Sequence, residues 1–129
     1  MNVVADTHTW IWAVTRSSNL SNLARTALES ADIVLIPAIC MWEVAMLDEK
    51  GKVEAMNGVR EFFEIAFVPG RMELVPLTPA IAARSAELGP GVHGDPADRL
   101  IAATALELSL PLVTRDQRLA WVPGLQVVW

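Results

Sequence analysis

The segment from Asp95 to Asp116 constrains the fold of this chain most, because it joins a buried helix to the strand that follows it. Asp95 and Pro96 form a helix start, in which the aspartate caps the first turn and the proline occupies a position that needs no N–H donor. The next residues are apolar on nearly every face, which indicates a helix packed on both sides. A short apolar strand over residues 110–114 comes next, and Asp116 follows it. In parallel α/β folds, functional sites form at this edge of the sheet.

Strands and helices alternate along the rest of the chain. This alternation predicts a three-layer α/β/α sandwich with a central, mostly parallel sheet of four to five strands. The length of 129 residues, with no repeat or linker, predicts a single domain over residues 1–129. Asn57 is expected to cap the fourth helix. The expected strands are residues 2–5, 33–36, 72–75, 110–114 and 125–128, and the expected helices begin at Thr7, Ser21, Ala38, Asn57, Thr78 and Asp95, with one helical turn after Asp116.

Composition and charge exclude several classes of protein. The net charge of −5 argues against a broad basic groove for duplex nucleic acid. The longest apolar run, residues 33–47, contains Pro37 and Glu43 and is too short to span a bilayer, so no membrane association is expected. The N-terminus lacks the layout of a secretory signal, and the single Cys40 cannot form an internal disulfide. These features together predict a cytoplasmic protein.

Four carboxylates stand at predicted strand ends or helix starts: Asp6, Glu43, Asp98 and Asp116. Each has a structural alternative. Asp6 could only cap the first helix, Asp98 could only be a first-turn charge, and Asp116 could be part of a polar loop. Glu43 lies among apolar residues, where an ionised carboxylate is costly unless it is paired or metal-bound. Its alternative is a capping box with Cys40.

The four carboxylates, taken together, indicate a cation-binding site. Like charges gathered within a few Å destabilise one another, and a divalent cation neutralises them. A site made only of oxygen ligands suits Mg²⁺ or Mn²⁺, which bind phosphates and activate water for attack on a phosphodiester. Zinc is disfavoured, because Cys40 and two scattered histidines give no zinc-ligand spacing. The set therefore predicts a magnesium or manganese site.

Four short motifs, in order along the chain, resemble a known family. They are Asp6-Thr7-His8-Thr9 with Trp12, then Ala38-Ile39 with Trp42-Glu43-Val44-Ala45, then His93 to Ala102, and finally Pro111 to Asp116. The last two are the more specific, and the resemblance covers essentially the whole chain. By these motifs the sequence resembles a PIN-domain ribonuclease of the VapC-like group, the toxins of bacterial toxin–antitoxin pairs.

The resemblance implies a PIN-domain-like fold and an acidic quartet of Asp6, Glu43, Asp98 and Asp116 that holds Mg²⁺ or Mn²⁺. It also implies a metal-dependent endoribonuclease that hydrolyses RNA, a cognate antitoxin protein as partner, and a homodimer. Family members commonly carry serines where this chain has Pro37 and Cys40, and loss of the hydroxyl at position 40 is expected to weaken the helix cap near Glu43.

Several neighbouring side chains remain open to two interpretations. Thr114 could orient Asp116 or a water molecule, or be an ordinary strand-end threonine. Arg99 could contact RNA phosphate or form a structural salt bridge. His8 and His93 could act in acid–base chemistry, although a metal site needs no histidine. The tryptophans Trp10, Trp12 and Trp42 could stack bases, but their helical setting favours the core or a protein interface.

Two other functions compete with the nuclease. A non-catalytic PIN-like module that binds RNA or protein would not need the complete acidic quartet. A phosphotransfer domain would need paired acids after its first strand and a lysine near its last, and neither Lys50 nor Lys52 lies near the final strand. The nuclease is therefore the favoured hypothesis.

Overall fold

A computed structural model of the chain describes residues 1–52 and 58–129. In these residues a five-stranded sheet has the order β3-β2-β1-β4-β5, and every neighbouring pair of strands is parallel. The sheet agrees with the prediction and is parallel throughout. Its strands are β1 (Val3–Ala5), β2 (Val34–Pro37), β3 (Met72–Val75), β4 (Leu112–Val113) and β5 (Val127–Val128).

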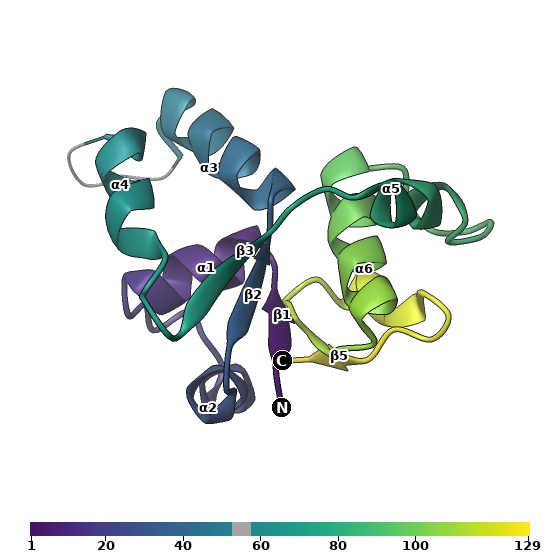
Figure 1. Cartoon of the computed structure of the whole chain (residues 1–129), viewed down its shortest axis with the longest axis horizontal. Coiled ribbons are helices and arrows are strands. Elements are labelled where there is room, and N and C mark those ends of the chain that lie inside the picture. Colours follow the sequence, from purple (N-terminus) through teal and green to yellow (C-terminus); the bar gives the residue numbers. More distant parts are fainter. Residues whose placement is uncertain (53–57) are drawn as a thin grey trace.

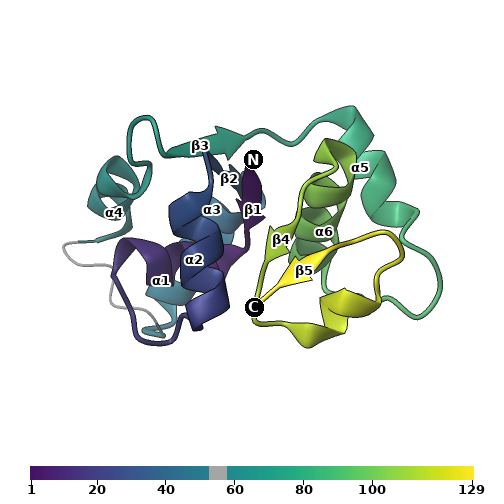
Figure 2. The same cartoon turned by 90° about the horizontal axis from the view of Figure 1, so that it is seen from below.

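Helices cover both faces of the sheet, which confirms the α/β/α sandwich. Figure 1 shows α1 to α4 on one side of the strands and α5 and α6 on the other, and Figure 2 shows the same division from below. No helix in the described residues is long and apolar enough to cross a membrane. The helices are α1 (Thr7–Val14), α2 (Asn22–Ser30), α3 (Ile39–Glu49), α4 (Val59–Ala66), α5 (Pro79–Ala86) and α6 (Pro96–Leu108), and a 3₁₀ helix, η1 (Gln117–Trp121), precedes β5.

Helix starts follow the local capping chemistry of the sequence. The side chain of Ser21 accepts the N–H of Ala24 at the start of α2, and that of Asp95 accepts the N–H of Asp98 at the start of α6. Thr78 caps α5 in the same way. The expected cap Asn57 lies outside the described residues, and the N-cap of α4 is Gly58, which makes no side-chain cap bond.

The fourth strand is shorter than the expected residues 110–114. Only Leu112 and Val113 pair with the neighbouring strands, although Pro111 and Thr114 still make single backbone hydrogen bonds across the sheet. The last strand is likewise shorter than the expected residues 125–128, and it lies at the edge of the sheet.

Trp10 joins α1 to α4 at the centre of the core. Its side chain is completely buried, and its indole N–H donates a 2.9 Å hydrogen bond to the carbonyl of Ala66. The rings of Phe62, Phe63 and Phe67 surround it, with centroids between 5.0 and 6.2 Å from the indole. Trp10 is therefore a core residue, as its helical setting favoured, and does not stack on a ligand.

The strand order reverses between β1 and β4. After β1 the chain moves outward through β2 and β3, then crosses back to place β4 on the other side of β1. In an open parallel sheet this switch point leaves a crevice beyond the carboxyl ends of the two strands, where ligands bind. Asp6 follows β1, and Thr114 follows β4, so both residues stand at the carboxyl ends of these two strands.

Candidate functional site: an acidic pocket at the switch point

A pocket of about 530 Å³ opens at the switch point. All four carboxylates singled out in the sequence line it, although they come from four separate parts of the chain. The structure therefore brings together Asp6, Glu43, Asp98 and Asp116. The remaining lining residues are Thr7, His8, Trp12, Asp95, Ile101, Arg115 and Arg118.

Asp6 both caps a helix and faces the pocket. Its Oδ1 accepts the N–H of Thr9 at 2.9 Å, so Asp6 caps α1, but it also lines the pocket and the cap is not its whole role. Its Oδ2 accepts a short hydrogen bond from the hydroxyl of Thr114. The cap fixes one oxygen of the carboxylate and the threonine fixes the other, so the orientation of the group is set.

Thr114 connects two of the four acids. Its side chain is fully buried at the end of β4, and its hydroxyl oxygen also accepts the N–H of Asp116 at 3.0 Å. Of the two interpretations from the sequence, the orienting role agrees with these contacts.

Glu43 projects from α3 toward the pocket and is held by α1. The hydroxyl of Thr7 donates to its Oε1 at 2.5 Å. Burial raises the pKa of Glu43, the Thr7 hydroxyl opposes the shift, and the charges of Asp95 and Asp6 add to it. The capping-box alternative is wrong, because Ala38 is the N-cap of α3 and makes no side-chain cap bond. The expected weakening of a cap at position 40 is also wrong, because Cys40 lies inside α3, two residues after the N-cap.

Asp98 lies in the first turn of α6, with its side chain 23% exposed. Burial raises its pKa to about 6, and the neighbouring charges of Asp95 and Glu43 add to the shift. A carboxyl group with this pKa is costly to ionise without a cation, which is the expected property of a metal ligand in the metal-free protein.

Asp116 caps η1 and is paired with Arg118. The guanidinium of Arg118 donates to both carboxylate oxygens, with Nε to Oδ1 at 3.0 Å and a terminal nitrogen to Oδ2 at 2.8 Å. This hydrogen bonding lowers the pKa of Asp116. Arg118 also lies 3.8 Å from Oδ2 of Asp98, so it offsets part of the negative charge of the pocket.

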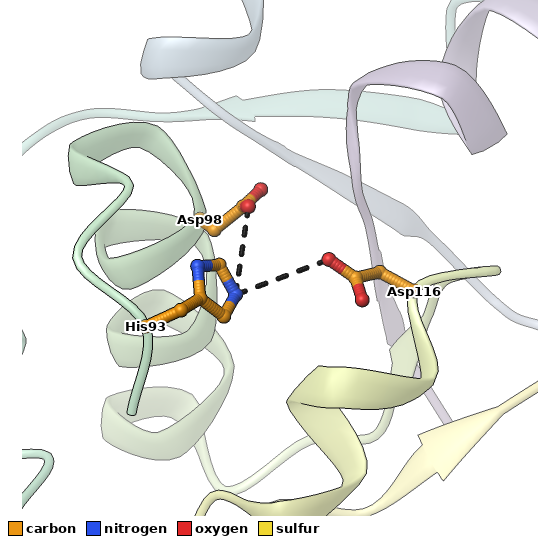
Figure 3. A group of neighbouring side chains, drawn as sticks. All are labelled: His93, Asp98 and Asp116. Atoms are coloured by element: carbon orange, nitrogen blue, oxygen red, sulfur yellow. Dashed lines mark ion pairs between the residues drawn. The ribbon is translucent and has the colours of Figure 1, made fainter. Parts of the chain in front are cut away.

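His93 lies between two of the acids (Figure 3). Its Nε2 is 3.6 Å from Oδ2 of Asp98 and 3.9 Å from Oδ2 of Asp116, too long for hydrogen bonds. This nitrogen is buried and has no hydrogen-bond partner within residues 1–52 and 58–129. The ligand atoms of the three residues lie within 4.8 Å of one another. An orphaned nitrogen beside two carboxylates fits a bound divalent cation, so the residues present could hold a metal ion.

Arg99 forms no salt bridge with a carboxylate of the described residues, and it does not line the acidic pocket. Its guanidinium donates to the backbone carbonyls of Ser85, Val92 and His93, at 3.0, 3.2 and 3.4 Å. It therefore ties the end of α5 and the loop carrying His93 to the start of α6. Sequence adjacency to Asp98 suggested a phosphate contact, but adjacent helix residues point in different directions.

Two contributors to the site were missed by the sequence reasoning. They are Thr7, which the sequence analysis places only in the first helix and the first motif, and Arg118, which it does not single out. Thr7 directly follows Asp6 in the first motif, which was the available signal. Nothing in the sequence indicates that its hydroxyl meets Glu43, because the pairing depends on the packing of α1 against α3.

Comparison with known proteins agrees with the geometry. Residues 3–125 match the family model described as PIN domain. The chain is 36% identical over 117 residues to ribonuclease VapC22 of Mycobacterium tuberculosis, which covers 91% of this chain and 88% of that protein.

Solved structures share the fold at lower sequence identity. VapBC2 of Rickettsia felis, solved with a DNA fragment from its promoter, matches with a TM-score of 0.73 at 18% identity, covering 98% of this chain and 97% of that one. VapC20 of Mycobacterium tuberculosis, described as a toxin that cleaves the sarcin–ricin loop, gives 0.68 at 12% identity, with 98% and 99% covered. The chain therefore belongs to the PIN-domain family, and within it to the VapC-like group.

Proposed function

We propose that this chain is an endoribonuclease that hydrolyses RNA phosphodiester bonds as the toxin of a toxin–antitoxin pair. The observation that carries the proposal is the gathering of four carboxylates in one pocket of a PIN-domain chain. The ribonuclease relative, at 36% identity over most of both chains, supports the same activity.

The proposed cofactor is Mg²⁺ or Mn²⁺, held by Asp6, Glu43, Asp98 and Asp116. When bound, such an ion supplies an activated water and charge stabilisation for phosphodiester hydrolysis. The chain's own residues orient the ligands: Thr114 holds Asp6, and Thr7 holds Glu43.

The proposed partners are an RNA substrate, a cognate antitoxin protein and a second copy of the chain. A toxin–antitoxin complex from Klebsiella pneumoniae is among the solved structures that share the fold, which supports the antitoxin. Trp42 is 57% exposed on α3 and Leu77 is 57% exposed before α5, and both line an apolar groove of about 200 Å³. Such a surface supports a protein partner or a homodimer. We propose that the chain acts as a single domain in the cytoplasm.

An RNA cleavage assay tests the function. Incubation with a structured RNA and Mn²⁺ should give discrete fragments, and addition of EDTA should stop their formation. Asp98→Asn should abolish cleavage, and Glu49→Gln, at an exposed position of the same helix as Glu43, should not. Binding of RNA by the wild type without any cleavage would instead favour the non-catalytic module.

A further inference from the structure

One wall of the acidic pocket is aromatic. Trp12, on α1, is half-buried and lines the pocket beside His8, which is exposed one helical turn earlier. The centroids of these two rings are 5.5 Å apart. The ring of Trp129, at the C-terminus, lies 5.8 Å from that of Trp12. Trp12 thus contacts two neighbouring rings and still lines the pocket.

The guanidinium of Arg115 lies beside this aromatic wall. The guanidinium carbon of Arg115 lies 5.9 Å from the centroid of the Trp12 ring, within the range of a cation–π contact. Arg115 is exposed and also lines the pocket, together with Arg118. The guanidinium of Arg118 is already paired with Asp116, whereas no carboxylate of the described residues forms a salt bridge with Arg115.

Trp12 and Arg115, which lies over its ring, are side chains of the kinds that bind nucleotides. Aromatic faces and guanidinium planes both stack on bases, and an arginine without a carboxylate partner can contact phosphate. The net charge of −5 makes general attraction of RNA weak. Base stacking on an aromatic ring depends little on charge, so it can contribute to RNA binding at this pocket.

We infer that Trp12 and Arg115 form a base-binding subsite, in which an unpaired base next to the scissile phosphate stacks on the Trp12–Arg115 pair. The inference rests on the proposed ribonuclease function and adds to it two residues that bind the substrate. The wall lies inside the pocket, beside the four carboxylates. A base can reach it only when it has left its helical stack, so the subsite selects a nucleotide in a single strand or loop.

The test separates the contribution of the bases to RNA affinity from that of the ribose phosphate backbone. The probes are a fluorescein-labelled octamer of adenosine nucleotides and an octamer of the same ribose phosphate chain without bases. Affinities are measured by fluorescence anisotropy with Mg²⁺ in the Asp98→Asn protein, and again after adding Trp12→Leu, Trp12→Phe or Trp121→Leu. Trp121 is the matched control, because it is 87% exposed and does not line the pocket.

The parent protein should bind the adenosine octamer about tenfold more tightly than the chain without bases. Trp12→Leu should remove this difference, chiefly by weakening the adenosine octamer. Trp12→Phe and Trp121→Leu should keep most of it. If Trp12→Leu fails to fold by circular dichroism, Trp12→Met provides a flexible apolar replacement for the same measurement. A tenfold difference that persists in a folded Trp12→Leu or Trp12→Met protein would overturn the inference, as would equal affinities in the parent.

Failure of the inference is distinguishable from failure of the proposed function. Equal binding of the two octamers by the parent protein, or a difference that persists in Trp12→Leu, would remove the subsite alone if the wild type still cleaves RNA with Mn²⁺. Absence of cleavage in the wild type would remove the ribonuclease, whatever the binding experiment shows.

Discussion

Thr114 donates a hydrogen bond to the carboxylate of Asp6 across 108 residues of sequence. The same hydroxyl oxygen accepts the backbone N–H of Asp116 at 3.0 Å. One buried side chain thus connects the end of β1 to the loop after β4, on both sides of the switch point. The positions of two acids in the pocket depend on it.

Replacement of this threonine should disturb the pocket more than the core. Thr114→Val keeps the shape of the side chain but leaves the N–H of Asp116 and one oxygen of Asp6 without their partner. We expect a loss of about 1 to 3 kcal/mol in the free energy of unfolding and a fall of about 10- to 100-fold in Mn²⁺ affinity or cleavage rate. Urea denaturation and single-turnover cleavage measure the two effects.

Thr104→Val is the matched control. Thr104 is also buried, but its hydroxyl donates to the carbonyl of Leu100 within α6 and contacts no acid. Its replacement should leave cleavage within about twofold of the wild type, since hydroxyl bonds of this kind contribute little to a helix. Equal loss of activity in both variants would show that Thr114 acts only through stability.

The raised pKa of Asp98 gives the metal-free protein a defined pH dependence. A carboxyl group whose pKa rises from 3.8 to about 6 on folding favours the folded state when protonated. This contribution is complete below pH 3.8 and is lost as the pH rises through about 6. Asp98→Asn removes it, so the variant should become progressively more stable than the wild type between pH 4 and pH 7, by about 1 kcal/mol at neutral pH.

Thermal denaturation in EDTA at pH 4.5 and pH 8 measures this difference. The unfolding temperature of Asp98→Asn relative to the wild type should be higher at pH 8 than at pH 4.5. A difference independent of pH would contradict the burial of an ionisable Asp98 among other carboxylates.

Arg99 should contribute to stability through the backbone carbonyls that it binds. Arg99→Gln removes its bonds to Ser85, Val92 and His93 and should lower the free energy of unfolding by about 1 to 3 kcal/mol. Hydrogen exchange should become faster at the end of α5 and in the loop that carries His93.

Arg84→Gln provides the comparison for Arg99. Arg84 pairs with Glu107 at 2.8 Å with both side chains partly exposed, and such a pair contributes at most about 1 kcal/mol. An effect of Arg84→Gln as large as that of Arg99→Gln would contradict the structural role assigned to Arg99.

Features that depend on neighbours in sequence were predictable. Ser21, Thr78 and Asp95 cap the helices that they were expected to cap, because the acceptor and the N–H it binds are only three residues apart. The parallel sheet followed from the alternation of strands and helices. The motifs of the resemblance identified four acids, and parallel topology places the residues after β1 and β4 at one edge.

Features that depend on packing between distant segments were not predictable. The hydroxyl of Thr7 meets Glu43 only because α1 lies against α3, and Arg99 finds its carbonyls only because α5 packs on α6. A single sequence does not show which distant segments pack together, so it indicates only the local roles of such residues. The roles of the four acids as metal ligands remain a prediction.

Titration of the protein with Mn²⁺, followed by electron paramagnetic resonance of the free ion, tests the central claim most directly. We predict that the wild type binds Mn²⁺, that Glu43→Gln and Asp98→Asn each weaken binding at least about tenfold, and that Glu49→Gln binds as the wild type does. Equal binding by all four proteins would contradict the claim that carboxylates from separate elements form one metal site.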